Sequence, residues 1–224
     1  RDRFNIRSND IEYTPIFLSQ AIIHKTGKCY IFSDCKNNLK KQLKIDVSFK
    51  KQKDIYPFIK KCGINKSFIC DINTINFNLA NAIKNYGTLK LQGDVIQLLK
   101  SKKNKTEQKG MLNSHKRDGA SLTKFMFWAK NQVQNKNITE MDAIKYLDNL
   151  RKSNKNFFSL SFPTIAGTGS NGAIVHYRAN KLTNKKIRKS DLFLVDSGAQ
   201  YFDGTTDVTR TISFNKPRKD QIDM

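Results

Sequence analysis

The chain has 224 residues, of which 38% are hydrophobic and 10% aromatic, a composition that suits a soluble globular protein with a buried core and excludes a disordered chain. No apolar run approaches the roughly 18–20 residues that a transmembrane helix needs, so we expect no membrane association. The formal net charge is +22, but the basic residues are spread through every segment and no DNA-binding signature is present, so we expect no nucleic-acid partner.

The first hundred residues predict alternating short strands and helices. The expected elements are a hairpin turning at 25–28, a helix over 55–62, a strand over 67–70 and a helix over 74–86. Gly27 suits a positive φ in the hairpin turn, and Gly63 and Gly87 suit the ends of the two helices. This order of elements predicts an α/β domain.

Four cysteines lie in the first third of the chain and form no C-x-x-C pair: Cys29, Cys35, Cys62 and Cys70. Zinc-finger spacing is therefore absent. We expect reduced and mostly buried thiols, which are typical of a cytoplasmic protein.

The middle of the chain predicts helices. Residues 101–110 are almost wholly polar, which marks a linker or the exposed first turn of a helix. A long helix is expected next, because apolar residues recur at three- and four-residue steps. Its expected inner face comprises Met111, Leu112, His115, Leu122, Phe125, Met126, Ala129 and Val133. Thr139, with Asp142 three residues later, predicts the N-cap of a further helix, and after Ser153 the pattern changes to strands and turns.

Two aspartates near the C-terminal end form a candidate metal site. An apolar strand ends at Asp196, a glycine-rich turn follows, and Asp207 is expected on a threonine-rich strand eleven residues later. Carboxylate oxygens suit hard divalent cations such as Mn²⁺, and a dinuclear centre can use one aspartate on one ion and the other as a bridge. Taken singly, Asp196 could be a turn residue and Asp207 a solvent-facing strand position. Together, the two aspartates favour metal ligation.

A glycine-rich loop lies upstream of the aspartates. It spans residues 162–172 and precedes a predicted short apolar strand that ends at His176. The loop lacks phosphate-loop spacing, so nucleotide binding is not expected. A histidine in this position could hydrogen-bond a substrate carbonyl, although an isolated histidine is more often structural.

Two segments carry a family resemblance: SFPTIAGTGSNGAIVHY at 161–177 and LVDSGAQYFDGTTDVTRT at 194–211. They resemble the catalytic domain of aminopeptidase P, the Xaa-Pro aminopeptidases of the pita-bread metallopeptidase family. The motif SHKRDG at 114–119 resembles the helix that opens this domain. Short motifs in the first 17 residues resemble the preceding domain of the three-domain members.

The resemblance implies an α/β fold (α+β overall). It consists of a creatinase-like α/β domain over 1–103, truncated at its start, followed by the first, incomplete half of a pita-bread catalytic domain over 104–224. Asp196 would be a terminal ligand of one metal, Asp207 would bridge both, and His176 would contact the substrate and steady the developing oxyanion.

The resemblance also implies cofactors and partners. The cofactors would be two divalent metal ions, Mn²⁺ first, with a hydroxide between them as nucleophile. The substrates would be peptides with proline at position two, and the intact enzyme would be a homodimer. His24 and His115 match no catalytic position of the family.

The family's ligand order is Asp, Asp, His, Glu, Glu, and no His or Glu follows Asp207 in this chain. We therefore expect the chain to be a piece of a longer cytoplasmic enzyme and to lack peptidase activity alone. The alternatives are a non-catalytic remnant or half of a split peptidase, a prolidase-like dipeptidase, and a basic nucleic-acid-binding module.

Overall fold

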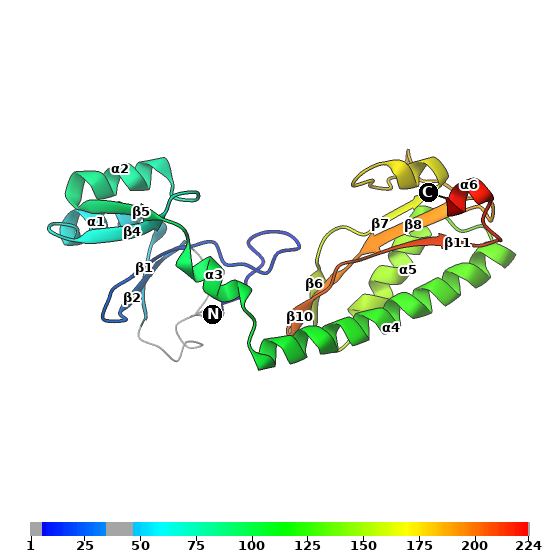
Figure 1. Cartoon of the computed structure of the whole chain (residues 1–224), viewed down its shortest axis with the longest axis horizontal. Coiled ribbons are helices and arrows are strands. Elements are labelled where there is room, and N and C mark those ends of the chain that lie inside the picture. Colours follow the sequence, from blue (N-terminus) through cyan, green and yellow to red (C-terminus); the bar gives the residue numbers. More distant parts are fainter. Residues whose placement is uncertain (1–5, 35–46, 224) are drawn as a thin grey trace. The chain divides into compact units, whose positions relative to one another are not determined.

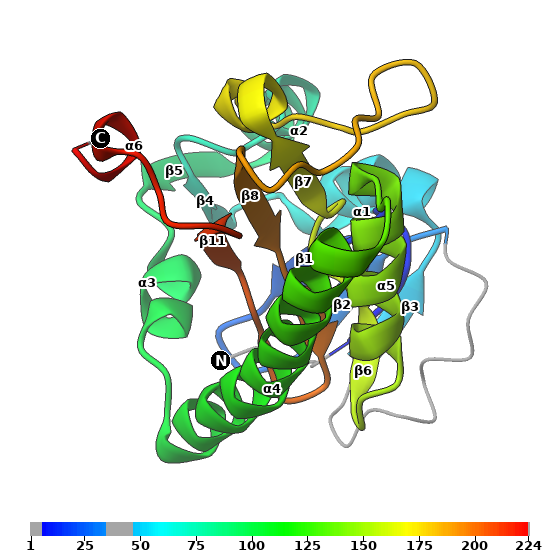
Figure 2. The ribbon, with the colours of Figure 1, turned by 90° about the vertical axis from the view of Figure 1, so that its right-hand side faces the viewer.

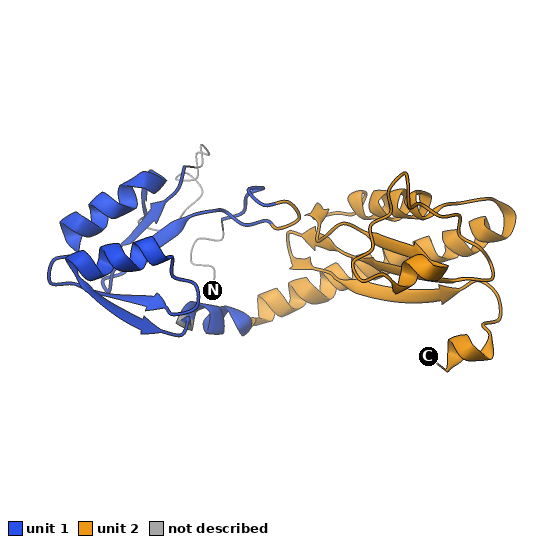
Figure 3. Ribbon diagram, turned by 90° about the horizontal axis from the view of Figure 1, so that it is seen from above, with its two compact units in different colours: residues 1–11, 15–102 blue, residues 12–14, 103–224 orange. Residues whose placement is uncertain are grey.

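The computed structural model describes residues 6–34 and 47–223, so Cys35 lies outside the described part. The chain forms two compact units (Figure 1, Figure 3): Arg1–Ile11 with Pro15–Lys102, and Glu12–Thr14 with Lys103–Met224. Within the described residues, no helix is both long enough and apolar enough to span a membrane.

Among its described residues, the first unit contains two small sheets. Its strands are β1 (Gln20–Ile23), β2 (Cys29–Phe32), β3 (Val47–Lys50), β4 (Ser67–Asp71) and β5 (Thr88–Gln92). β1 and β2 are antiparallel, β3 pairs with β2 in parallel, and β4 pairs with β5 in parallel. The predicted hairpin is confirmed, since the turn between β1 and β2 contains Gly27 with a φ of 92°.

The described helices of this unit are η2 (Gln52–Asp54), α1 (Ile55–Cys62), α2 (Phe77–Tyr86) and α3 (Val95–Ser101). α1 has the predicted bounds. α2 begins three residues later than predicted, because the Asn76 side chain accepts hydrogen bonds from the backbone amides of Asn78 and Leu79 and caps the helix there. The core of the unit consists of Phe32, Ile55, Ile59 and Ile83. Cys29 is buried and Cys70 half-buried, whereas Cys62 is exposed, so the expectation of mostly buried thiols holds for only part of the set.

The second unit packs two helices on one face of a sheet. Its elements are α4 (Lys105–Asn135), α5 (Glu140–Lys152), β6 (Phe157–Leu160), β7 (Ile165–Thr168), η3 (Gly169–Ala173), β8 (Leu192–Ser197), β9 (Ala199–Tyr201), β10 (Gly204–Thr205), β11 (Val208–Ser213) and α6 (Lys219–Ile222). One antiparallel sheet has the order β11-β8-β7 and a second the order β10-β9-β6. α4 and α5 lie side by side across the β7-β8-β11 sheet (Figure 2).

The core of the second unit joins these helices to the sheet. Its buried residues are Leu122, Phe125, Ala129, Val133, Ile138, Ala143, Leu147, Ala166, Ile187, Phe193, Val195 and Phe214. Both helices begin with capping boxes, Asn104 with Glu107 on α4 and the predicted Thr139 with Asp142 on α5.

The predicted inner face of α4 is correct for its second half and wrong for its first turns. Leu112 is 57% exposed and His115 is exposed, while Ser114 and Asp118 are buried instead. The reason is the β9–β10 hairpin: a Cβ at Gly204 would overlap Ser114 Oγ, so the backbone of the hairpin lies directly against this face of the helix.

Candidate metal centre

Asp196 lies near the end of β8, on the face of the sheet that α4 and α5 do not cover. Its neighbours across the sheet are Ile165 of β7 and Thr209 of β11. On the opposite, buried face of β8 lie Phe193, Val195 and Ser197. Asp196 is half-buried, and its Oδ1 atom is buried without a hydrogen-bond partner among the described residues. Leaving such an atom unpaired costs about 1–3 kcal/mol, so a cation is a suitable partner for it.

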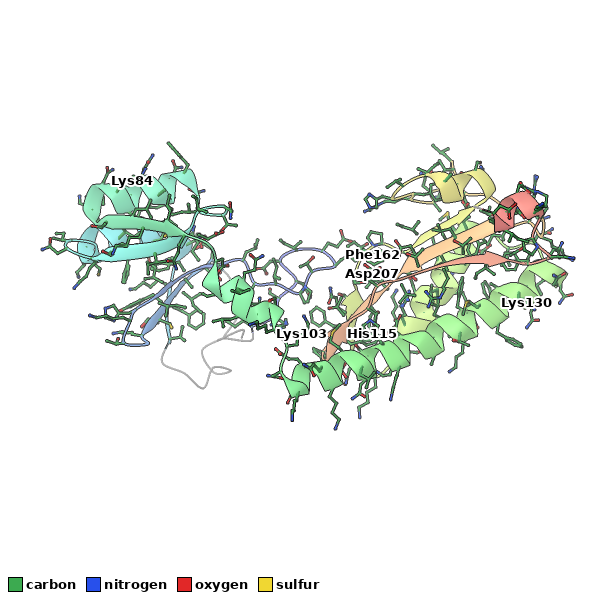
Figure 4. All side chains as sticks on the ribbon, viewed as in Figure 1. Lys84, Lys103, His115, Lys130, Phe162 and Asp207 are labelled. Atoms are coloured by element: carbon green, nitrogen blue, oxygen red, sulfur yellow. The ribbon has the colours of Figure 1, made fainter. Side chains whose placement is uncertain are left out.

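Asp207 lies on the same face as Asp196. It precedes the first residue of β11 by one position, so the prediction that it lies on the strand is wrong by one residue (Figure 4). Thr209 is directly opposite Asp196, and Asp207 stands two positions before Thr209. Because side chains alternate between the two faces with a period of two, the two carboxylates are diagonal neighbours on adjacent chain segments. Asp207 is exposed, which leaves it open to a ligand.

A close approach of two backbone segments sets the position of Asp207. A Cβ at Gly198 would overlap both Thr206 O and Ser161 Oγ, so only glycine fits there. Thr206 is buried; its amide donates to Ala199 O at 2.9 Å, and its Oγ1 accepts from the Ala199 amide at 3.0 Å. These bonds hold the chain immediately before Asp207.

His176 lies in a turn and not at the end of a strand. The segment predicted as an apolar strand forms the end of η3 and a turn closed by a hydrogen bond from Tyr177 N to Ile174 O at 3.1 Å. Ile174 and Val175 are 53% and 82% exposed, so their side chains do not alternate between a buried and an open face. His176 is exposed and has a φ of 53°, which is uncommon for a residue other than glycine.

The loop that carries His176 folds back over the face that carries Asp196. Gly167 of β7 is opposite Leu194 of β8, and Leu194 lies on the same face as Asp196. A Cβ at Gly167 would lie 2.7 Å from Gly172 N, and a Cβ at Gly172 would lie 3.6 Å from Leu194 Cβ. The backbone of η3 therefore rests on this part of the sheet, where the glycines leave space for it.

The three predicted site residues do not form a complete metal site. Within residues 6–34 and 47–223, no group of three or more His, Cys, Asp or Glu side chains is placed to hold a metal ion. Asp196 and Asp207 share a face, and in this part of the chain no hydrogen bond joins His176 to either of them. The arrangement is a pair of carboxylates beside a glycine-rich loop.

Sequence reasoning missed Glu140, which is fully buried at the start of α5. Its carboxylate accepts hydrogen bonds from the backbone amides of Thr168 and Lys185 and from the side chains of Asn171 and Tyr177. Burial raises the pKa of Tyr177, and the bond to Glu140 raises it further while Thr183 lowers it, so the phenol remains a donor. A glutamate in the first turn of a helix is usually exposed, so the sequence contains no signal for this role.

A second buried cluster joins α4, α5 and β9. Arg151 Nε and Nη2 donate to Asp118 Oδ1 and Oδ2 at 2.8 and 2.9 Å, and the Tyr201 hydroxyl donates to Asp118 Oδ1 at 2.9 Å. Burial and the adjacent Asp118 carboxylate raise the pKa of Tyr201. Next to this cluster, Arg117 pairs with Asp203 and lies over the Tyr201 ring. The motif at 114–119 therefore has a structural role, through Asp118.

Residues 109–224 match the family model of metallopeptidase family M24, and residues 3–107 match that of the Creatinase/Prolidase N-terminal domain. The chain belongs to metallopeptidase family M24. The predicted fold class, a creatinase-like α/β domain followed by a pita-bread metallopeptidase domain, is confirmed for this M24 chain.

Curated relatives of this M24 chain are named as Xaa-Pro aminopeptidases, as the resemblance predicted. A probable Xaa-Pro aminopeptidase P of Paracoccidioides brasiliensis is 37% identical over 232 residues, which cover 96% of this chain and 37% of the relative. Xaa-Pro aminopeptidase 1 of Dictyostelium discoideum is 33% identical over 225 residues, which cover 98% of this chain and 36% of the relative. The chain thus spans little more than a third of the length of the curated relatives it matches.

Solved structures with the same fold include an aminopeptidase and a prolidase. X-prolyl aminopeptidase from Caenorhabditis elegans, described as a cytosolic enzyme with a di-nuclear active site, is 30% identical with a TM-score of 0.86, covering 97% of this chain and 37% of that one. Prolidase from Pyrococcus furiosus shares the fold at 22% identity and a TM-score of 0.68, covering 88% of this chain and 56% of that one.

Proposed function

We propose that this M24 chain forms part of an Xaa-Pro aminopeptidase, which releases the N-terminal residue from peptides with proline at position two. We propose further that Asp196 and Asp207 are metal ligands of this enzyme. One observation carries the proposal: the buried Oδ1 of Asp196 has no hydrogen-bond partner among the described residues, and Asp207 stands diagonal to it on the same face. The names of the curated relatives support the substrate class.

The donor set suits oxygen-preferring divalent ions. Asp196 would hold one ion and Asp207 would be shared between two, in line with the di-nuclear active site of the C. elegans relative. Bound divalent ions, Mn²⁺ first, would supply Lewis acidity and lower the pKa of a water molecule. His176 would donate a hydrogen bond to the substrate carbonyl oxygen, where negative charge develops during attack.

The chain by itself should bind metal weakly. The family resemblance requires a histidine and two glutamates in addition to the aspartates, and this sequence contains no His or Glu after Asp207. We infer that the isolated chain hydrolyses no Xaa-Pro peptide. Peptide hydrolysis by the purified chain with added Mn²⁺, lost when a chelator is added, would contradict this inference.

A Mn²⁺ titration followed by electron paramagnetic resonance tests the metal assignment. We expect D196N and D207N each to weaken Mn²⁺ binding at least tenfold, because an amide replaces a charged ligand. The matched control is D220N, which removes an exposed aspartate that pairs with Arg218 on α6, and it should bind Mn²⁺ as the wild type does. Equal affinity in all four proteins would exclude the two aspartates as ligands.

We propose four further properties of the intact enzyme. They are Mn²⁺ as the metal in use, a homodimer as the intact assembly, a cytoplasmic location, and a domain boundary between residues 103 and 104.

A further inference from the structure

The Glu140 carboxylate accepts hydrogen bonds from several parts of the segment that joins β7 to β8. Its Oε1 accepts from Thr168 N at 2.8 Å and from Asn171 Nδ2 at 3.0 Å. Its Oε2 accepts from the Tyr177 hydroxyl at 2.8 Å and from Lys185 N at 3.0 Å. These four donors lie at the last residue of β7 and at three positions of the loop that follows it, so one side chain ties these segments together.

Among the described residues, the hydrogen-bond donors to this carboxylate are backbone amides, an amide side chain and a phenol. Glu140 is 0% exposed and lies at the N-terminus of the 13-residue helix α5, where the helix dipole favours negative charge. A carboxylate is an acceptor-only group with two oxygens, which suits four converging donors. The isosteric amide of glutamine offers one oxygen and turns an NH₂ group toward donors, so it cannot replace all four bonds.

The loop presents His176 next to one of these anchored residues. Tyr177 is 5% exposed, with its hydroxyl bonded to Glu140, whereas the preceding His176 is exposed and has a φ of 53°. A left-handed backbone is unfavourable for histidine and persists only where its surroundings hold it. The buried Tyr177 and the turn bond to Ile174 provide that restraint.

We propose that Glu140 is a positioning residue for His176: by closing the loop through Tyr177, it holds the His176 backbone in the left-handed conformation. The inference rests on the proposed function, in which His176 contacts the substrate. Glu140 is fully buried, so it would act through the loop and not by contact with the substrate.

Backbone ¹⁵N relaxation of ¹⁵N-histidine-labelled chain tests this, because the sequence contains only three histidines, His24, His115 and His176. In the wild type we expect a His176 order parameter of about 0.85, the value of rigid backbone. In E140Q it should fall below about 0.6 while His24 and His115 are unchanged. An unchanged His176 order parameter in E140Q would overturn the proposal.

Two further variants separate positioning from a general loss of stability. Leu147 is fully buried on the same helix α5, so L147A leaves a cavity there. This variant should leave the His176 order parameter unchanged. If E140Q does not fold, Y177F removes only the hydroxyl, which bonds Asn171 and Thr183 as well as Glu140, and it should lower the same order parameter. Retained order in Y177F, or an equal loss of order in L147A, would count against positioning.

Added Mn²⁺ distinguishes failure of this inference from failure of the proposed function. If Asp196 and Asp207 bind the ion, Mn²⁺ should broaden the His176 resonances in the wild type and not in D196N. Absence of broadening in the wild type would overturn the proposal that Asp196 and Asp207 bind the metal. Loss of order in E140Q is measured without metal and would still support positioning.

Discussion

At the scale of single residues, Asp196 and Asp148 show two ways in which a carboxylate is held in this fold. Asp196 keeps a buried oxygen without a hydrogen-bond partner in the described part of the chain, and an unpaired buried acceptor costs about 1–3 kcal/mol. Asp148 on α5 is also half-buried, but its Oδ1 accepts a hydrogen bond from Thr164 Oγ1 at 2.7 Å. The unpartnered oxygen of Asp196 supports the proposed ligand role, and Asp148 has a structural partner.

Asp148 should make the stability of the protein depend on pH. Burial raises its pKa above the ordinary value of 3.8, against the lowering effects of Thr164, Lys152 and Arg151. The folded state therefore binds the proton more tightly than the unfolded state does. The free energy of unfolding must then fall as pH rises from about 3.8 through the folded-state pKa, and this loss is complete above it.

The variant D148N checks this prediction, because asparagine keeps the acceptor for Thr164 and removes the ionisation. We expect D148N and wild type to be about equally stable below pH 3.8. The advantage of D148N should then grow with pH and level off towards neutrality, in chemical unfolding measured from pH 3 to 7. A difference in unfolding free energy that stays constant over this range would show that Asp148 does not titrate differently in the two states.

At the scale of elements, the Asp118–Arg151 pair fixes the first half of α4 against α5 and β9. Both side chains are essentially inaccessible, at 1% and 0%, and the Tyr201 hydroxyl completes the Asp118 carboxylate. This cluster explains why polar residues are buried in the first half of α4, where apolar periodicity predicted Leu112 and His115.

Removing one partner of this pair should be costly. We expect R151M to lower the free energy of unfolding by about 3–5 kcal/mol, because Asp118 remains buried without its cation. The double variant D118N/R151M should recover a large part of that loss, since no uncompensated charge remains. Urea unfolding measures both.

The exposed pair Arg218–Asp220 on α6 provides the control, and R218M should unfold as the wild type does. A loss below about 1 kcal/mol in R151M would show that the pair is dispensable.

At the scale of the whole molecule, 41 basic residues stand against 19 acidic ones. On α4, the exposed lysines are Lys105, Lys109, Lys116, Lys124 and Lys130, the last of which is labelled in Figure 4. This helix contains two acids: Glu107, which belongs to the capping box, and Asp118, which is paired with Arg151 in the interior. The folded state therefore carries considerable self-repulsion.

Salt should accordingly stabilise the protein. Between 10 and 200 mM NaCl, where the screening length falls from about 30 Å to below about 10 Å, we expect Tm to rise by several degrees. Differential scanning calorimetry measures it, with an equal osmolality of glycerol as the control for effects unrelated to charge. A Tm that does not change, or falls, with NaCl would mean that the charges are already balanced locally.

The sequence by itself determined the local elements and the family. Helix caps such as Thr139 with Asp142 and turn residues such as Gly27 act over a few positions, so their effects can be predicted from neighbours in the chain. The two aspartates were predicted from the strand–turn–strand pattern, and the motif spacing then identified the M24 family.

The tertiary structure decided what depends on distant segments. The register of β8 and β11 places Asp207 diagonal to Asp196, and the approach of Gly172 to Gly167 turns a predicted strand into the loop that carries His176. The burial of Glu140 and Asp118 follows from partners 28 and 33 or more positions away, Thr168 and Arg151 among them. Hydrophobic period and capping contain no information on such partners, because a buried carboxylate is stable only where several remote donors converge on it.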